Sequence, residues 1–335
     1  MKKIKFVLLF LFVMILVSCN VNSNKVKIGF LFDNYRASRW EKEQAFFIEK
    51  ANQLGAEVLV SSANGDSDLQ LNMAEKMISD GAKVIVVVPC NVNSAAAIVR
   101  KAHAKNIKVI AYDRLIKNSD LDLYLSYDSY KVGEYMAKYM INIKPKGNYV
   151  LINGDKLDNN AVAVYNGFMF GLKQNIEKGE ISILYSGFMD GWSGIEAEFY
   201  TDKIIRLSEK RPDVILSAYD GLTDGIVSAL KKYNLVKKVL LTGQDAEINA
   251  CVRIMNGTQA MTIYKPGKEL AYKCAEISIQ MAKNENIEFK DSIYTGTKQT
   301  ASLLLDPIIV DKSNIEKTII KDGVFSLEEI KNINE

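Results

Sequence analysis

Histidine is almost absent from this sequence: His103 is the only one among 335 residues. Histidine is the side chain most often used for acid–base chemistry near neutral pH and a frequent ligand of zinc. A histidine-based catalytic triad or zinc site would have to be built around His103, which lies in a Lys- and Ala-rich stretch of helical character. We therefore expect no histidine-dependent enzyme and no bound metal, and nothing in the sequence indicates a cofactor.

Cysteine is scarce as well. The four cysteines are Cys19, Cys90, Cys251 and Cys274, and their spacing matches no metal-binding pattern. If Cys19 carries a lipid, as argued below, an odd number remains. We expect these three to be buried or partly buried thiols. A single disulfide among them is the alternative, because exported proteins meet oxidising conditions.

Two further absences narrow the class of protein. No G-x-G-x-x-G motif follows the first predicted strand, where Gly29 stands alone, so the dinucleotide-binding fingerprint is missing. The sequence also has no marked excess of basic residues, since 43 Lys and Arg stand against 40 Asp and Glu. Because binding to nucleic acid needs a basic face, we expect no nucleic-acid partner.

The N-terminal segment has the pattern of a secretory signal peptide. Three lysines among the first five residues precede an apolar run over 6–17, which is too short to span a bilayer comfortably, and Ser18 and Cys19 follow. The four residues Leu-Val-Ser-Cys at 16–19 resemble the lipobox of bacterial lipoproteins, which implies that Cys19 is lipidated and becomes the new N-terminus. A plain signal peptide followed by an incidental cysteine is the alternative.

Removal of the signal peptide, residues 1–18, would take away three lysines and no acidic residue, so the mature chain would be formally neutral. Residues 19–25 are mostly polar and would form a tether between the lipid and the folded protein. We therefore expect an exported protein that its lipid holds at the periplasmic or cell-surface face of a membrane.

From residue 25 onward, apolar strands alternate with amphipathic helices. The first series has strands at 26–32, 57–61, 84–88 and 109–112 and helices at 40–54, 67–80 and 94–105. The second series has strands at 148–153, 181–188, 214–217, 239–242 and 260–264 and helices at 130–143, 161–175, 195–206, 223–233, 251–256 and 268–283. This rhythm predicts an α/β fold with two similar doubly wound parallel-sheet lobes, joined by several short crossings that form a hinge.

Polar and aromatic residues follow many of these strands, at the edge where open parallel sheets bind ligands. They are Asp33, Asn34, Arg39, Trp40, Asp113, Arg114, Asp158, Asn159, Asn160, Asp190, Gly191, Trp192, Tyr219, Asp220, Gln244, Asp245 and Lys265. Taken singly, each has a plainer explanation, because an aspartate after a strand is commonly a helix N-cap and a tryptophan is commonly a core residue. Their joint occurrence in both lobes favours one ligand site.

This mixture of side chains suits a sugar. Asp, Asn and Arg can each engage neighbouring hydroxyls through directional hydrogen bonds. The apolar face of a pyranose can lie on an aromatic ring, and the only two tryptophans, Trp40 and Trp192, fall one in each lobe. We expect these two rings to sandwich a sugar from opposite walls of a cleft.

A set of short segments between about residue 26 and about residue 323 carries a resemblance to a known family. They are Lys27-Ile28-Gly29, Arg39-Trp40, Ser62-Ala63-Asn64-Gly65, Ala111-Tyr112-Asp113-Arg114, Val132-Gly133-Glu134, Gly147-Asn148-Tyr149, Asp158-Asn159-Asn160-Ala161, Asp190-Gly191-Trp192, Gly243-Gln244-Asp245-Ala246, Gly257-Thr258-Gln259, Tyr264-Lys265-Pro266 and Ile320-Lys321-Asp322-Gly323. With them the chain resembles the D-xylose-binding members of the type I periplasmic sugar-binding family, which also includes ribose- and galactose-binding proteins. No single segment is specific, but together they are.

The resemblance implies a division into two sugar-binding lobes and assigns roles in the site. The N-terminal lobe would comprise 26–125 plus 265–292, and the C-terminal lobe 126–264 plus 293–325. Two tryptophans, Trp40 and Trp192, match the family's stacking positions. The polar sugar contacts would be Arg39, Asp113, Arg114, Asp158, Asn160, Asp245 and Lys265.

One position departs from the family pattern. Where the xylose-binding proteins have asparagine in a Ser-Asn-Asp segment, this chain reads Ala218-Tyr219-Asp220. Asparagine offers a donor and an acceptor on a short arm, whereas tyrosine offers one hydroxyl on a bulky ring. If Tyr219 points into the pocket, we predict an altered sugar preference or weaker binding of xylose. The alternative is that its ring turns outward and leaves the pocket unchanged.

The resemblance also implies a function without chemistry on the ligand. The chain would be the monomeric substrate-binding lipoprotein of an ABC transporter that closes around a monosaccharide and delivers it to a permease paired with a cytoplasmic ATPase. A sugar sensor that serves a chemoreceptor or a sensor kinase is the main alternative. Transcription repressors of the same fold carry a DNA-binding helix pair where this chain has a signal peptide. Paired acids such as Asp158 and Asp245 would suit a hydrolase, but sugar contacts explain them without catalysis.

Overall fold

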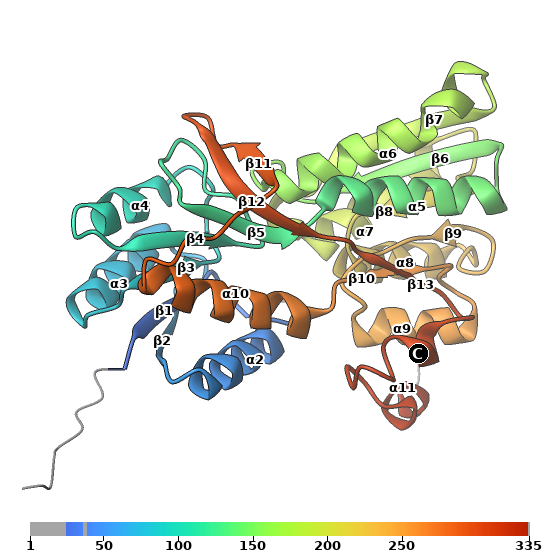
Figure 1. Ribbon diagram of the computed structural model, residues 1–335. Helices are drawn as coiled ribbons and strands as arrows, with labels where there is room; N and C mark the ends of the chain where they lie inside the picture. The colour runs from blue at the N-terminus through green and yellow to red at the C-terminus, as the bar shows by residue number, and fades with distance from the viewer. Residues whose placement is uncertain (1–24, 36–38, 334–335) are drawn as a thin grey trace, which may run out of the picture.

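The computed structural model describes residues 25–35 and 39–333, which form two α/β lobes side by side (Figure 1). Each lobe contains a mostly parallel sheet with helices on its faces, as the alternation of strands and helices predicts. The expected fold class, two doubly wound parallel-sheet lobes, is confirmed. The predicted signal peptide and the lipidation site Cys19 lie outside the described residues.

The N-terminal lobe is built on a seven-stranded sheet in the order β11-β12-β5-β4-β3-β1-β2. All neighbours in this sheet pair in parallel except β11 and β12, which are antiparallel. The strands are β1 (Lys27–Phe32), β2 (Glu57–Ser62), β3 (Val84–Val87), β4 (Lys108–Tyr112), β5 (Leu123–Tyr127), β11 (Asp291–Tyr294) and β12 (Gln299–Leu305). The interior strand β3 reads Val-Ile-Val-Val and is buried throughout, as expected for a strand covered on both faces.

Helices cover both faces of this sheet. They are α2 (Arg39–Gln53), α3 (Ser67–Ser79), α4 (Ala96–His103) and α10 (Gly267–Ala282). The buried side chains of α2 and α10, such as Phe47 and Leu270, share one core with one face of the sheet. Those of α3 and α4, such as Met77 and Ile98, share a second core with the other face. The single histidine, His103, lies at the end of α4 and contacts Asp122 through Nε2 at 2.8 Å.

The C-terminal lobe has a four-stranded parallel sheet in the order β7-β6-β8-β9 and a small antiparallel pair, β10 and β13. The strands are β6 (Gly147–Asn153), β7 (Ile181–Phe188), β8 (Val214–Ser217), β9 (Leu240–Leu241), β10 (Thr262–Tyr264) and β13 (Ile308–Val310). The helices are α5 (Ser129–Ile143), α6 (Asn159–Glu177), η1 (Asp190–Trp192), α7 (Gly194–Leu207), α8 (Asp220–Lys232), α9 (Ile248–Asn256), η2 (Ile315–Lys317) and α11 (Leu327–Asn332).

The chain crosses between the lobes at three short connections. They lie between β5 and α5, between β10 and α10, and between β12 and β13. Each connection is only a few residues long, as a hinge requires. The third crossing corrects the expected boundary, which placed 293–325 in the C-terminal lobe. Because β12 pairs with β5 through residues 302–305, residues 291–305 belong to the N-terminal sheet and the chain leaves that lobe only after residue 305.

The three cysteines within the described ranges are free thiols: Cys251 and Cys274 are buried, and Cys90 is half-buried. In the same ranges, no group of three His, Cys, Asp or Glu side chains is arranged to hold a metal ion. None of the helices in 25–35 and 39–333 is both long enough and apolar enough to cross a membrane.

Candidate functional site

A cleft of about 780 Å³ lies between the two lobes, at the carboxyl ends of their strands. Polar and aromatic side chains from both lobes line its walls. All of the predicted site residues are among them: Arg39, Trp40, Asp113, Arg114, Asp158, Asn160, Trp192, Tyr219, Asp245 and Lys265. The structure therefore brings together, from strand ends far apart in the sequence, most of the set that the sequence analysis grouped. Two members of that set, Asn159 and Asp220, are not part of the cleft lining.

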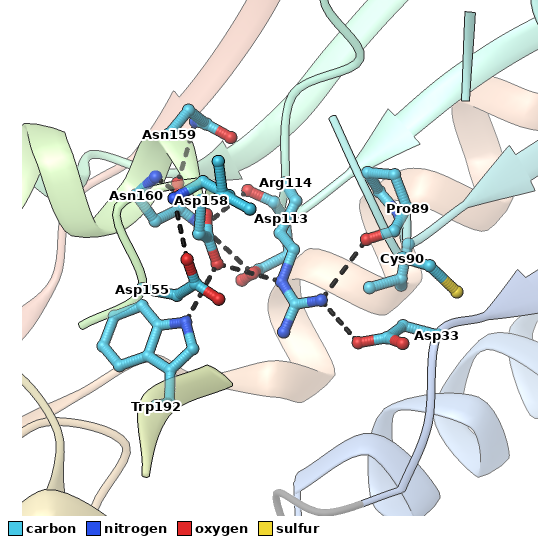
Figure 2. Close-up of polar contacts among 12 residues, drawn as sticks. Asp33, Pro89, Cys90, Asp113, Arg114, Asp155, Asp158, Asn159, Asn160 and Trp192 are labelled. Atoms are coloured by element: carbon cyan, nitrogen blue, oxygen red, sulfur yellow. Dashed lines mark hydrogen bonds and ion pairs between the residues drawn. The ribbon is translucent and has the colours of Figure 1, made fainter. Parts of the chain in front are cut away.

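Arg114 lines this cleft and lies between acidic groups of both lobes. Its Nη1 lies 2.5 Å from Asp33 in the N-terminal lobe, and its Nε lies 3.0 Å from Asp158 in the C-terminal lobe. Figure 2 shows the guanidinium reaching from Asp33 on one side toward Asp158 on the other. Burial alone would lower the pKa of Arg114, but the two carboxylates outweigh it and raise this pKa above its usual value.

Asp113 forms a second charged cluster with Arg39. Its Oδ2 lies 2.5 Å from Nη2 of Arg39, whose Nη1 also reaches Glu43 on the next turn of α2. Burial alone would raise the pKa of Asp113, but the charges of Arg39 and Lys265 outweigh it and lower the pKa to about 2. This carboxylate is therefore ionised near neutral pH and can accept strong hydrogen bonds.

Asp245 and Lys265 form the third ion pair of the cleft, with 2.7 Å between Nζ and Oδ1. Arg39 approaches the same oxygen through Nε at 3.8 Å. This Nε is buried and donates no hydrogen bond within the described part of the chain. It is therefore a donor that a bound ligand could use.

Asp158 and Asn160 stand at the start of α6 and face the N-terminal lobe. The Asp158 carboxylate caps the helix by accepting from the backbone N–H of Asn160 at 2.9 Å. Asn160 in turn donates to the carbonyl of Asp113 at 3.0 Å. Burial raises the pKa of Asp158, while the charge of Arg114 opposes the increase. Both the capping role and the cleft position expected for Asp158 are therefore present.

The two tryptophans differ in how they meet the cleft. Trp192 is half-buried, packs edge-on against Tyr219 and donates through Nε1 to Asp158 at 3.3 Å. Trp40 is only 4% exposed and packs against Phe32 and Tyr112. The guanidinium of Arg39 lies 3.9 Å from the centre of the Trp40 ring. The sandwich of a sugar between both rings stays a prediction, and it would require Arg39 to share or leave this face of Trp40.

Tyr219 lines the cleft and is not turned outward. Its hydroxyl lies 3.2 Å from a carboxylate oxygen of Glu247, and its ring meets the edge of Trp192. Burial, with the nearby charge of Glu247, raises the pKa of Tyr219, so the hydroxyl stays neutral. The ring therefore takes up cleft space while its one polar group is already engaged.

Three residues of this site have a strained backbone. Asp113, Trp192 and Asp245 have φ values of 65°, 57° and 86°, in the left-handed region that side chains with a Cβ seldom adopt. Each such residue costs on the order of 1–3 kcal/mol. The surrounding hydrogen bonds must hold these three residues in place, and strain of this kind is typical of ligand-binding sites.

Two charged residues, one in the cleft and one behind its wall, were not among the predicted contacts. Asp33 follows β1 and pairs with Arg114, and Glu43 lies beneath Arg39 and also accepts from the Tyr112 hydroxyl. Asp33 was already in the group of polar residues that follow a strand, although it was not named as a sugar contact. Glu43 could not, since it lies inside an ordinary amphipathic helix and only the fold turns it toward the cleft charges.

Most charges of the cleft are held in ion pairs. The cations Arg39, Arg114 and Lys265 pair with the acids Asp33, Asp113, Asp158 and Asp245. Two further acids of the lining, Asp155 and Asp190, form no ion pair within the described residues. A ligand with a full charge would leave one of these buried groups without its partner, which is costly. A neutral ligand rich in hydroxyls can instead insert between them as both donor and acceptor. The site is thus suited to binding a neutral polar molecule.

Comparison with known proteins agrees with this geometry. Residues 28–286 match the model of a family described as periplasmic binding protein domain. The D-xylose-binding periplasmic protein of Haemophilus influenzae is 40% identical over 329 residues, which cover 98% of this chain and 99% of that protein. The D-xylose-binding periplasmic protein of Escherichia coli is 38% identical over 330 residues, which cover 98% of this chain and 100% of that protein.

A solved structure of another solute-binding protein has a similar fold. An ABC transporter solute-binding protein from Clostridium phytofermentans, with bound β-D-glucose, superposes with a TM-score of 0.83 at 27% identity. The match covers 91% of this chain and 99% of that one. The two-lobe fold is therefore shared with a protein whose structure holds a sugar.

Proposed function

The chain belongs to the periplasmic binding protein domain family, and from this premise we propose that it is the sugar-binding component of an ABC importer. Its relatives are substrate-binding proteins and not enzymes, so the protein binds its ligand without converting it. The proposed ligand is a neutral monosaccharide, D-xylose or a close relative.

One observation carries this proposal: buried charges held in ion pairs line an inter-lobe cleft beside the half-buried ring of Trp192. Ionised groups form stronger hydrogen bonds than neutral ones, and bidentate groups such as carboxylates and guanidinium fix the direction of several bonds. The indole supplies a flat apolar surface for the C–H face of a sugar ring. Together these features suit a pyranose better than an acid, a phosphate or an apolar molecule.

Closure of the two lobes is the proposed mechanism. Contacts already bridge the lobes in the cleft, between Arg114 and Asp158 and between Asn160 and Asp113. A sugar that bonds to both walls would favour the closed arrangement by its higher affinity for it. The three short crossings would let the lobes rotate without disturbing either sheet. The closed form would then dock on the membrane permease.

Tyr219 is proposed to set the sugar preference. We expect the Tyr219→Asn variant to bind D-xylose about tenfold more tightly relative to hexoses than the wild-type protein does, because an amide adds a donor and an acceptor of about 1 kcal/mol each. Calorimetric titration with xylose, ribose, arabinose, glucose and galactose measures this.

Tyr219→Phe is the matched control, since it removes only the hydroxyl that contacts Glu247. It should leave the order of the sugars unchanged if the bulk of the ring sets the preference. Tight binding of xylose alone by the wild-type protein would refute the idea of an altered preference.

We also propose that a lipid on Cys19 anchors the protein near the permease. The support is the lipobox-like segment at 16–19. In cells that make the Cys19→Ser variant, we expect the protein to move from the membrane fraction to the soluble fraction, because the attached acyl chains provide the membrane affinity. Cell fractionation followed by immunoblotting measures this.

Cys90→Ser is the matched control, because it removes a cysteine that lies in the cleft and far from the anchor segment in sequence. It should leave the protein in the membrane fraction. A Cys19→Ser protein that stays with the membrane would exclude the lipid anchor.

A further inference from the structure

Asp220 is a buried carboxylate directly behind the cleft wall. It is the first residue of α8, follows the cleft residue Tyr219, and is 0% exposed. Its Oδ1 accepts from Nε2 of Gln259 at 2.9 Å. Its Oδ2 accepts from the Thr262 hydroxyl at 2.8 Å and from the backbone N–H of Glu247 at 3.0 Å. No part of Asp220 is accessible to a ligand, so any effect on binding must be indirect.

These hydrogen bonds hold the chain segment that carries Asp245. Asp245 and Ala246 are consecutive residues with φ values of 86° and 51°, an unfavourable backbone for two residues that have a Cβ. Asp220 binds the segment on both sides of this pair. Its backbone N–H donates to the carbonyl of Gln244 at 3.1 Å, and its carboxylate accepts from the N–H of Glu247.

A second contact reaches the strained pair itself. The Thr262 hydroxyl, which donates to Asp220, also accepts from the backbone N–H of Ala246 at 3.4 Å. Gly243 leaves room for this arrangement, because a Cβ at that position would come within 1.8 Å of Oδ1 of Asp220. The carboxylate thus lies against the backbone from 243 to 247.

Holding a carboxylate here opposes folding. Burial raises the pKa of Asp220 to about 7, although Arg253, Gln259 and Thr262 favour the charged form. A raised pKa means that the folded state disfavours this charge relative to the unfolded chain. A group that costs stability and has well-formed contacts with a strained loop is better explained by a role in binding than by a role in folding.

We propose that Asp220 is a positioning residue: it holds the strained Asp245–Ala246 pair so that the Asp245 carboxylate is presented to the sugar. This inference rests on the proposed function, because it presupposes a sugar in the cleft. It adds a residue outside the cleft lining to those that determine affinity.

The Asp220→Asn variant tests the proposal with little change in volume. If the new amide NH₂ takes the place of Oδ2, it faces the backbone N–H of Glu247. If it takes the place of Oδ1, it faces the NH₂ group of Gln259. In either position two hydrogen-bond donors face each other. Gln259 cannot rotate to compensate without losing the bond that its Oε1 accepts from Arg253 at 2.9 Å. We expect the affinity for the best-bound sugar of the wild-type protein to fall about tenfold or more, measured by titration calorimetry.

Ala246→Gly supplies a readout that a purely structural role would not change. Glycine adopts positive φ without strain. It should therefore stabilise the backbone conformation that presents Asp245 to the sugar when Asp220 no longer holds that conformation. In the Asp220→Asn background we expect this second substitution to recover affinity about threefold or more. Asn234→Gly is the matched control: Asn234 also has positive φ, 55°, but follows the far end of α8, so it should recover nothing.

The outcomes separate the two proposals. If the wild-type protein binds no sugar, the proposed function fails. If it binds sugar and Asp220→Asn binds it equally well, only the positioning role fails. A loss of affinity that Ala246→Gly does not reverse, or that Asn234→Gly reverses equally, would also overturn the positioning role.

Discussion

Replacing Asp113 with asparagine is expected to lower the affinity for the best-bound sugar by about 10²- to 10³-fold, a loss of roughly 3 to 4 kcal/mol. The carboxylate is ionised near neutral pH because the charges of Arg39 and Lys265 lower its pKa to about 2 despite burial. Hydrogen bonds from sugar hydroxyls to such a group are each worth about 1.5–3 kcal/mol. An amide offers one weaker acceptor and leaves Arg39 with less of its counter-charge.

Asp122→Asn is the matched control for this prediction. Asp122 is another aspartate of the N-terminal lobe that contacts basic groups, His103 and Lys108, but it lies outside the cleft. Loss of the Asp122 charge should leave the affinity for the sugar within about twofold of the wild-type value. Ion pairs that are partly exposed and screened by solvent have only local effects. If Asp113→Asn bound sugar within threefold of the wild-type protein while melting normally, Asp113 would not be a sugar contact.

Trp192→Ala should have the second largest effect. Removing the indole takes away the flat wall of the cleft, and we expect a loss of roughly 2–3 kcal/mol, or about 30- to 150-fold in affinity. Trp192→Phe keeps a smaller ring and should lose less than about tenfold. Titration calorimetry of both variants with the same sugar measures the difference. Equal losses for both would mean that the indole acts only through its Nε1 bond to Asp158.

The position of this ring can be tested without removing it. Gly154 lies under Trp192, and a Cβ at Gly154 would come within 2.3 Å of the indole carbons. Gly154→Ala should therefore push the ring from its place and weaken sugar binding, although every proposed contact residue is still present. Unchanged affinity in Gly154→Ala would show that the ring need not occupy this position.

The sequence was most informative at the positions where polar side chains follow a strand. The polar residues after each parallel strand could be grouped in advance, because the carboxyl ends of such strands meet at one edge of the sheet. Asp113, Asp158 and Asp245 were identified in this way, and all three line the cleft. The alternation of apolar strands with amphipathic helices also indicated the two doubly wound lobes.

Other features depend on contacts that no local pattern encodes. The last crossing could not be placed because the partner of β12, strand β5, lies far away in sequence. Trp40 and Trp192 look alike in sequence, but only the fold buries Trp40 beneath Arg39. The positive φ angles of Asp113 and Asp245 likewise arise from tertiary hydrogen bonds and not from the residue type.

The most direct test of the account is calorimetric titration of the purified protein with a panel of neutral monosaccharides, with the sugar recovered and identified afterwards. The account predicts that at least one pentose or hexose binds with one molecule per chain and is recovered unchanged. Binding of none of them, or recovery of a converted product, would contradict the central claim that this cleft holds a free monosaccharide and performs no chemistry on it.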